Sequence, residues 1–579
     1  MITGQPDAEP GGTDTSDVPP DGLAPSWRAT PQPLSRLRWA LLTALASGLL
    51  LAAAFAPVGV WPLAVVSPAL LVAALYGRSL RAAFAVGLVF GLAFFFPLLA
   101  WVINLAWFAW IALAIASALI FALFCVAQRL LLNLRYWPLA VAGWWVAAEA
   151  FRDRWPWGGF PWGRLAMSQA GLPTQGWAAI GGPALLSFVV ALTGTTLAWV
   201  LLTLLTNTGL TNPGLTNPGL ANGARPTGGR AGRWRRTGIA AVAFAATAGV
   251  SCLPAALPLD PVPAGAKTAV IAAIQGNVPR ARSLQAQLAE VQVTLNHATA
   301  TDKLAAKVAA GTLPQPDLVV WPENSTDIDP TQYPPIYQQI SSAASAIGRP
   351  ILVGAVLQDP QRNAGVLWLP GKGPTALYVK RRLVPFGEYI PFRSLISKVT
   401  SLTQLQPTDF VPGHQTVVFG VSQIRLGDVI CYEIAFDDLV RSEVTAGANV
   451  LAMQSNDATF ERDGQTGESG QQLAMARIRA VEFDRAVVVA STTGYSAIIA
   501  PDGHLITSSG TWQQAELEAR VPLLTETTLA NRLGAGPEWA IVAATALAFG
   551  LATARAAASR RRERRPRSAD SPAGTGEGR

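Results

Sequence analysis

The 579-residue sequence is poor in cysteine, histidine and charged residues, and each shortage excludes a class of protein. Its 3 cysteines are too few for a disulfide framework in a chain of this length. Its 3 histidines argue against a metal site built from several imidazoles. Only 14% of the residues are charged and 50% are hydrophobic, a balance that is rare in soluble proteins and typical of chains whose apolar mass faces lipid.

The formal net charge of +8 does not indicate a nucleic-acid-binding protein. The basic residues lie beside apolar runs and in the C-terminal tail, without aromatic residues interleaved on a soluble face. We interpret them as signals of membrane topology and expect no nucleic-acid partner.

Eight apolar runs have about the ~20 residues that a bilayer requires. They lie near residues 38–56, 59–77, 81–100, 105–127, 136–152, 183–205, 237–255 and 537–556. The sequence therefore predicts a multi-pass α-helical membrane protein with eight transmembrane helices.

Arginine is concentrated in every second loop of this series, as in the stretches 230–236 and 560–565. Basic loops stay in the cytoplasm, so both termini are expected there, in a protein of the plasma or inner membrane. The polar stretch 265–525 follows the seventh apolar run and is expected outside the cytoplasm.

Composition divides the chain into five parts. They are a disordered cytoplasmic tail at 1–35, a transmembrane domain at 36–260 with a low-complexity cytoplasmic loop at 206–236, an extracytoplasmic polar domain at 265–525, an eighth transmembrane helix at 536–557, and a basic disordered cytoplasmic tail at 558–579.

Within 265–525, short β-branched runs such as TAVIAAIQ and PILVGAV alternate with helical patterns such as 281–309 and 468–484. Nearly continuous apolar runs of this length are typical of buried strands. Their alternation with helices predicts an α/β layered domain.

Glu323, Lys380 and Cys431 stand at the ends of three apolar strands, where α/β domains tend to place their active sites. A free thiol with a pKa of about 8.5 is only a few per cent thiolate at neutral pH and needs activation. A carboxylate can act as the base, and a neighbouring lysine favours the thiolate and stabilises an oxyanion. Histidine is scarce, so this arrangement is favoured over a pair with His414, which stays an alternative.

Each of the three residues also has an ordinary structural explanation. A cysteine at the end of a strand is more often a small core residue. Glu323 is also suited to a turn or a helix cap, and Lys380, beside Arg381 and Arg382, to a solvated basic edge. Their combination is therefore more informative than any one of them.

The combination resembles the nitrilase superfamily, whose catalytic residues are a glutamate, a lysine and a cysteine in motifs of this kind. The motifs, in chain order, are QGNVP at 275–279, WPEN at 321–324, YVKRRLVPFGEYIPF at 378–392, GDVICYE at 427–433 and SND at 455–457. The resemblance implies an extracytoplasmic nitrilase-like αββα sandwich.

The order of the parts is similar to that of the apolipoprotein N-acyltransferases, which join seven spans, a nitrilase-like domain and an eighth span. FPW at 160–162 also resembles their membrane part, so the resemblance extends over about residues 35–560. It implies an acyltransferase that acts last in lipoprotein maturation.

The same resemblance implies a two-step, ping-pong reaction. Cys431 takes an acyl group from a phospholipid as a thioester and passes it to the α-amino group of a lipoprotein diacylglyceryl-cysteine. Glu323 is implied as the general base and Lys380 as the group that stabilises the oxyanion. Supporting or substrate-binding roles are expected for Glu388, Tyr432 through its backbone N–H, and Glu433.

Neither the residues nor the resemblance implies a metal or an organic cofactor, and we expect a monomer. Two alternatives stay open. One is a membrane-anchored amidase or nitrile hydrolase that gives the acyl group to water, although eight spans exceed what an anchor needs. The other is a transporter, scaffold or helper protein, against which the scarcity of ionisable residues deep in most spans argues.

Overall fold

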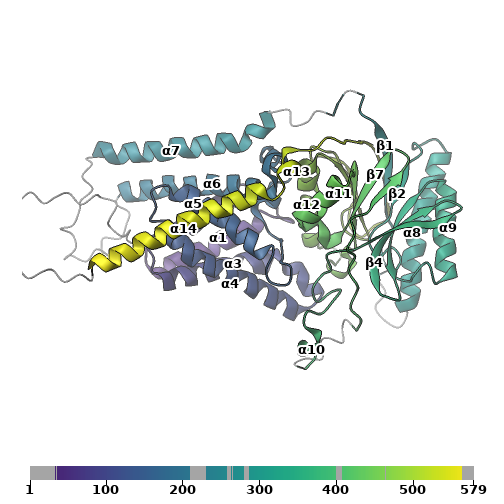
Figure 1. Ribbon diagram of the computed structural model, residues 1–579, viewed down its shortest axis with the longest axis horizontal. Helices are drawn as coiled ribbons and strands as arrows, with labels where there is room; N and C mark the ends of the chain where they lie inside the picture. Colours follow the sequence, from purple (N-terminus) through teal and green to yellow (C-terminus); the bar gives the residue numbers. More distant parts are fainter. Residues whose placement is uncertain are drawn as a thin grey trace, which may run out of the picture.

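The computed structural model describes residues 33–563 except for 34, 209–229, 257–261, 264, 280–285, 399–406 and 463. Figure 1 shows a bundle of helices beside an α/β part. Most of the two predicted tails, and residues 209–229 of the predicted loop, lie outside the described residues.

All eight predicted apolar runs lie in helices. These are α1 (Leu37–Ala53), α2 (Leu63–Leu75), α3 (Leu80–Leu98), α4 (Trp107–Leu131), α5 (Trp137–Arg152), α6 (Trp177–Thr208), α7 (Arg230–Cys252) and α14 (Gly536–Glu563). The helices α6 and α7 thus extend into both ends of the predicted loop at 206–236, and α14 extends into the predicted tail at 558–579.

Helices α2 and α6 also begin at other residues than the predicted spans. Helix α2 is shorter, because it begins after Pro62 and the backbone leaves the helical conformation at Tyr76. Helix α6 begins earlier and is interrupted at Gly181 and Gly182, whose φ of 71° is left-handed; its regular part starts at Pro183, as predicted.

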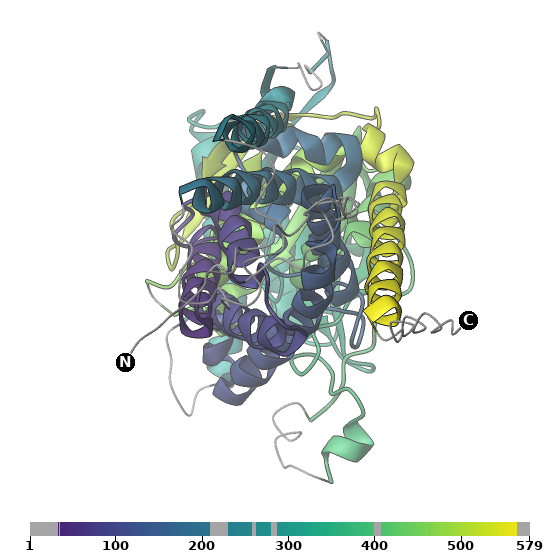
Figure 2. The same cartoon turned by 90° about the vertical axis from the view of Figure 1, so that its left-hand side faces the viewer.

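Five of the described helices, namely α3, α4, α6 with the turn before it, α7 and α14, are long and apolar enough to cross a membrane. Helices α1 and α2 are apolar but have 17 and 13 residues. Few side chains of α7 and α14 are buried, and Figure 2 shows α14, in yellow, along one flank of the bundle. The chain therefore has several helices suited to a membrane, and the crossing of all eight stays a prediction.

The α/β part contains two six-stranded sheets with the orders β12-β1-β2-β3-β4-β5 and β11-β10-β9-β8-β7-β6. The strands are β1 (Thr268–Gln275), β2 (Leu318–Val320), β3 (Ile351–Leu357), β4 (Arg362–Leu369), β5 (Gly373–Val379), β6 (Val418–Val421), β7 (Ile424–Ile430), β8 (Val450–Ser455), β9 (Ala486–Ser491), β10 (Ala497–Ile499), β11 (Leu505–Ser508) and β12 (Ala515–Pro522).

Each sheet has a parallel centre, formed by β1, β2 and β3 in the first and by β7, β8 and β9 in the second. The carboxyl ends of β1 and β9 adjoin, since the backbone N–H of Asn277 donates to the carbonyl of Thr492 at 3.1 Å. The residues that follow the parallel strands of both sheets therefore gather at one edge of the sandwich.

The two sheets pack face to face and helices cover their outer faces, which confirms the predicted α/β sandwich. Residues such as Ile271, Leu352 and Val488 fill the space between the sheets. Helices α8 (Ala286–Ala309) and α9 (Pro334–Ile347) pack on the first sheet. Helices α11 (Asp437–Thr445) and α12 (Gly467–Phe483) pack on the second.

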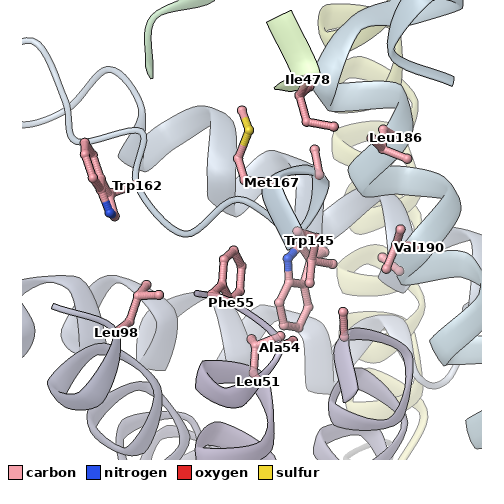
Figure 3. Packing of buried hydrophobic residues seen from close by; sticks show 14 of the residues in the cluster. Leu51, Ala54, Phe55, Leu98, Trp145, Trp162, Met167, Leu186, Val190 and Ile478 are labelled. Atoms are coloured by element: carbon pink, nitrogen blue, oxygen red, sulfur yellow. The ribbon is translucent and has the colours of Figure 1, made fainter. Parts of the chain in front are cut away.

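Helix α12 also packs on the helical bundle, so that it is buried on both sides. A single hydrophobic cluster extends from α1 through the bundle to α12 and the second sheet. Figure 3 shows Ile478 of α12 near Met167 and Leu186, which belong to the membrane part. This shared core fixes the position of the α/β part relative to the bundle.

Candidate active site

Glu323 follows β2 and is buried at the edge where the parallel strands end. Its Oε1 accepts hydrogen bonds from Asn363 Nδ2 at 2.7 Å and from Lys380 Nζ at 2.8 Å. Its Oε2 accepts one from the backbone N–H of Asn456 at 3.0 Å. Gly354 allows this turn to lie close to β3, because a Cβ there would meet the Pro322 carbonyl oxygen at 2.1 Å.

Lys380 follows β5, and its side chain is 1% exposed. Its ammonium pairs with Glu323 at 2.8 Å and with Glu388 at 3.0 Å. Burial alone would lower the pKa of Lys380, but these two carboxylates raise it well above its usual value. The lysine is therefore a fixed cation at the centre of the site.

Glu388 lies in the loop after β5 and holds the lysine from the other side. Its Oε1 accepts from Asn363 Nδ2 at 2.8 Å, and its Oε2 accepts from the backbone N–H of Val384 at 2.7 Å. The amide of Asn363 thus bridges both carboxylates that pair with the lysine.

Cys431 follows β7 and begins a short 3₁₀ helix, Cys431–Ala435. Its φ of 52° is left-handed, a conformation that strains a residue with a side chain and is often retained at functional sites. Burial and, next, the carboxylate of Glu323 raise the pKa of the thiol, while the charge of Lys380 lowers it. The resting sulfur is therefore a neutral thiol beside a base and a cation.

Glu433 joins the turn that contains the cysteine to the turn that follows the lysine. Its carboxylate is buried and accepts four hydrogen bonds. The donors are the backbone N–H groups of Ile430 (2.9 Å), Arg381 (2.6 Å) and Arg382 (3.0 Å), and the hydroxyl of Tyr378 (2.8 Å). Burial raises the pKa of Glu433, and these hydrogen bonds act in the opposite direction.

Tyr432 directs its side chain toward the membrane part. Its hydroxyl donates to the carbonyl of Gly159 at 3.0 Å, and its ring lies parallel to those of Phe160 and Trp162, with centroids 6.3 and 6.4 Å away. The Trp-rich loop after α5, residues 153–164, therefore contacts Tyr432, the residue next to the candidate nucleophile Cys431.

A cavity of about 350 Å³ opens between residues 157–159 of that loop and residues 381–389, which follow Lys380. Its lining includes Trp157, Arg382, Tyr389, Tyr432 and Phe436. A wall that combines aromatic rings with two guanidinium groups and the carboxylate of Asp409 suits a molecule that has both an apolar chain and a polar head.

The structure thus brings Glu323, Lys380 and Glu388 into direct contact, and it places Cys431 and Glu433 on the adjoining turn. Sequence reasoning did not identify Asn363, because it lies inside a strand that was not predicted. His414 is exposed, whereas Cys431 is buried. That these residues carry the chemistry stays a prediction.

Two family models match most of the chain. The model of the apolipoprotein N-acyltransferase N-terminal domain matches residues 47–196, and the carbon-nitrogen hydrolase model matches residues 270–528. The apolipoprotein N-acyltransferase of Mycolicibacterium smegmatis is 38% identical over 517 residues, which are 85% of this chain and 82% of that protein. The chain belongs to the apolipoprotein N-acyltransferase family.

The apolipoprotein N-acyltransferase of Azotobacter vinelandii is 30% identical over 502 residues, 83% of this chain and 89% of that protein. Among solved structures, Saccharomyces cerevisiae Nit3, of branch 10 of the nitrilase superfamily, is 17% identical with a TM-score of 0.32, covering 44% of this chain and 90% of that one. Membership in the apolipoprotein N-acyltransferase family, together with the described apolar helices, confirms the prediction of a membrane-associated acyltransferase.

Proposed function

We propose that this apolipoprotein N-acyltransferase transfers an acyl chain from a phospholipid to the N-terminal diacylglyceryl-cysteine of lipoproteins, by a ping-pong reaction through a thioester on Cys431. The observation that carries the proposal is the buried contact of Lys380 with Glu323 and Glu388 beside that cysteine. Glu323, Lys380 and Cys431 are the proposed catalytic residues.

In the first half-reaction Sγ of Cys431 attacks the ester carbonyl carbon of the phospholipid, and Glu323 takes the thiol proton. Because burial keeps the thiol neutral at rest, this proton transfer accompanies the attack. The ammonium of Lys380 and the backbone N–H of Tyr432 stabilise the oxyanion of the tetrahedral intermediate. Collapse breaks the ester C–O bond, and Glu323 returns the proton to the oxygen of the departing lysophospholipid.

In the second half-reaction the α-amino group of the diacylglyceryl-cysteine attacks the thioester carbonyl. Glu323 takes a proton from the attacking amine, the C–S bond breaks, and the sulfur regains its proton. A thioester is activated toward amines, so one difficult acyl transfer becomes two easier ones. Glu388 fixes the lysine, and Glu433 orients the cysteine turn.

We further propose that all eight helices cross the membrane, with both termini in the cytoplasm and residues 265–525 outside it. The arginine-rich alternate loops support this orientation. An active site that adjoins the membrane part brings two lipid-anchored substrates together and raises their effective concentration.

The test is intact-protein mass spectrometry of the purified full-length enzyme after incubation with phospholipid vesicles. We expect an acyl mass that hydroxylamine removes, and we expect it to be absent from Cys431→Ala. Addition of a diacylglyceryl-cysteine peptide should discharge the thioester and yield the N-acylated peptide.

Two outcomes would contradict the proposal. Phospholipid consumption without an adduct on the wild-type enzyme would exclude covalent catalysis by Cys431. Release of free fatty acid with the peptide unmodified would instead indicate an amidase-like transfer to water.

A further inference from the structure

A second polar side chain, that of Gln472, reaches the sulfur of Cys431 from helix α12. Its Nε2 lies 3.5 Å from Sγ, within the range of an N–H···S hydrogen bond. Gln472 is 2% exposed, so water does not compete for this contact. The helix approaches the cysteine from its own layer of the sandwich, separately from the strands that carry Glu323 and Lys380.

The partners of the amide fix its orientation. Its Oε1 accepts a hydrogen bond from the hydroxyl of Ser455 at 2.8 Å, which directs the NH₂ group away from β8. The Nε2 also donates to Oε1 of Glu468, one turn earlier on the same helix. An amide NH₂ group has two hydrogens, so one serves Glu468 and the other is available to the sulfur.

We propose that Gln472 is a further catalytic residue, which donates a hydrogen bond to Sγ of Cys431, stabilises the thiolate as it forms and holds the sulfur in position for attack. The inference deepens the proposed function and rests on the role proposed there for Cys431.

The charges around the sulfur explain why such a donor matters. Glu323 and Asp457 face Cys431 from the β2 turn and the β8 turn, and each raises the pKa of the thiol. Glu468 faces it from α12, where burial raises the pKa of Glu468 itself well above its usual value. Lys380, after β5, lowers the pKa of the thiol, as does the hydrogen bond from Gln472. A thiolate accepts a hydrogen bond more strongly than a thiol does, so the donor favours the nucleophilic form.

The position of Gln472 is set by the membrane part through its neighbour. Gln471 binds four groups of the bundle and its loops and so anchors α12. Its Oε1 accepts from the indoles of Trp101 (3.3 Å) and Trp162, and its Nε2 donates to the carbonyls of Ala56 (3.0 Å) and Leu98 (3.1 Å). The donor to the sulfur is thus preorganised by the docking of the two parts.

The test measures how fast iodoacetamide alkylates Cys431 in the full-length protein in detergent micelles between pH 6 and pH 9. Alkylation is read on the peptide that contains Cys431, because Cys252 is exposed and also reacts. The variants are Gln472→Met, which keeps the size and removes the donor, and Gln472→Glu, which replaces NH₂ by oxygen. Gln423→Leu, in the exposed turn between β6 and β7, is the matched control.

We expect the alkylation rate at pH 8 to fall about tenfold in Gln472→Met, as for a one-unit rise of the thiol pKa, and further in Gln472→Glu. The rate of thioester formation should fall with it, and the KM for phospholipid should stay unchanged. Gln423→Leu should match the wild type.

Wild-type alkylation rates across this pH range in either folded variant would overturn the inference. If Gln472→Met melts at a lower temperature than the wild type, a slower alkylation of that variant does not distinguish a lost donor from a loosened fold. The alkylation rates of Gln472→Glu then test the inference. Failure of the proposed function is a separate outcome. If alkylation of Cys431 depends on Gln472 but the wild-type enzyme forms no thioester with phospholipid, the proposed function is refuted. The hydrogen bond from Gln472 to the sulfur is then still supported.

Discussion

The substitution Glu433→Gln tests how firmly the turn that carries Cys431 must be held. The carboxylate accepts four hydrogen bonds, two on each oxygen. Glutamine has nearly the same shape but keeps only one acceptor oxygen. Its NH₂ group must face one of the two pairs of donors.

The size of the expected effect depends on which pair of donors loses its acceptor oxygen. The amide oxygen should stay with the backbone N–H groups of Arg381 and Arg382, since neither can turn away. On the other side the hydroxyl of Tyr378 can rotate and accept a hydrogen bond, but the N–H of Ile430 cannot. One buried N–H without a partner costs about 1–3 kcal/mol. If this cost falls on the transition state, thioester formation slows by about 5- to 150-fold.

The assay is the time course of the acyl mass on the full-length enzyme with excess phospholipid, together with the melting temperature of each variant. Tyr378→Phe is the control, because it removes one donor and leaves Ile430 paired; its effect should be smaller. A Glu433→Gln enzyme that acylates and melts like the wild type would refute the view that this carboxylate positions the cysteine.

Three further predictions concern Lys380, Asp437 and Tyr432. Lys380→Met should slow thioester formation by about 100- to 1000-fold, measured by the same mass assay, because it removes the cation from the oxyanion site. Asp437→Asn should cost about 3 kcal/mol, read as a lower melting temperature, because the buried Arg164 and Arg479 both pair with this carboxylate at 2.8 and 2.6 Å. Burial alone would raise the pKa of Asp437, but the two guanidinium groups hold it well below its usual range. Its contribution is therefore fully present above the unfolded-state pKa of about 4 and is lost as the pH falls toward the folded-state pKa, which a pH series of melting curves will show. Tyr432→Phe should lower stability by about 1 kcal/mol, since it deletes one hydrogen bond to the membrane part.

The membrane helices and the buried strands were predictable from the sequence because their signals are local. An apolar run of about 20 residues indicates a helix that faces lipid, whatever surrounds it. The strands β1, β3, β8 and β9 are buried along almost their whole length, so they read as continuous apolar runs. The glycine break in α6 changes only the residue at which the helix begins, and the predicted helix itself is present.

The edge strands β11 and β12 were not predicted, unlike the edge strand β5, which precedes Lys380. In β11 and β12 the residues are partly exposed or irregularly buried, and antiparallel pairing holds them in place. Their apolar pattern is therefore too weak to distinguish a strand from a loop.

The same contrast applies to the candidate site. The motifs around Glu323, Lys380 and Cys431 were recognisable in the sequence. Asn363 and Gln472 were not, because an amide in a strand or a helix has no local signal of its partners. Their contacts to Glu323 and to the cysteine sulfur arise only when segments 40 and 41 residues apart in the chain come together.

The helix α12 has a consequence for any attempt to divide this protein. One side of it, with residues such as Met475 and Ile478, completes a core that the membrane helices fill, and Gln471 ties it to their loops. A fragment that begins at residue 265 would expose this apolar surface to water and lose the anchor beside the nucleophile. The α/β part, expressed alone, should therefore aggregate rather than yield a working hydrolase. The chain must be produced and assayed whole.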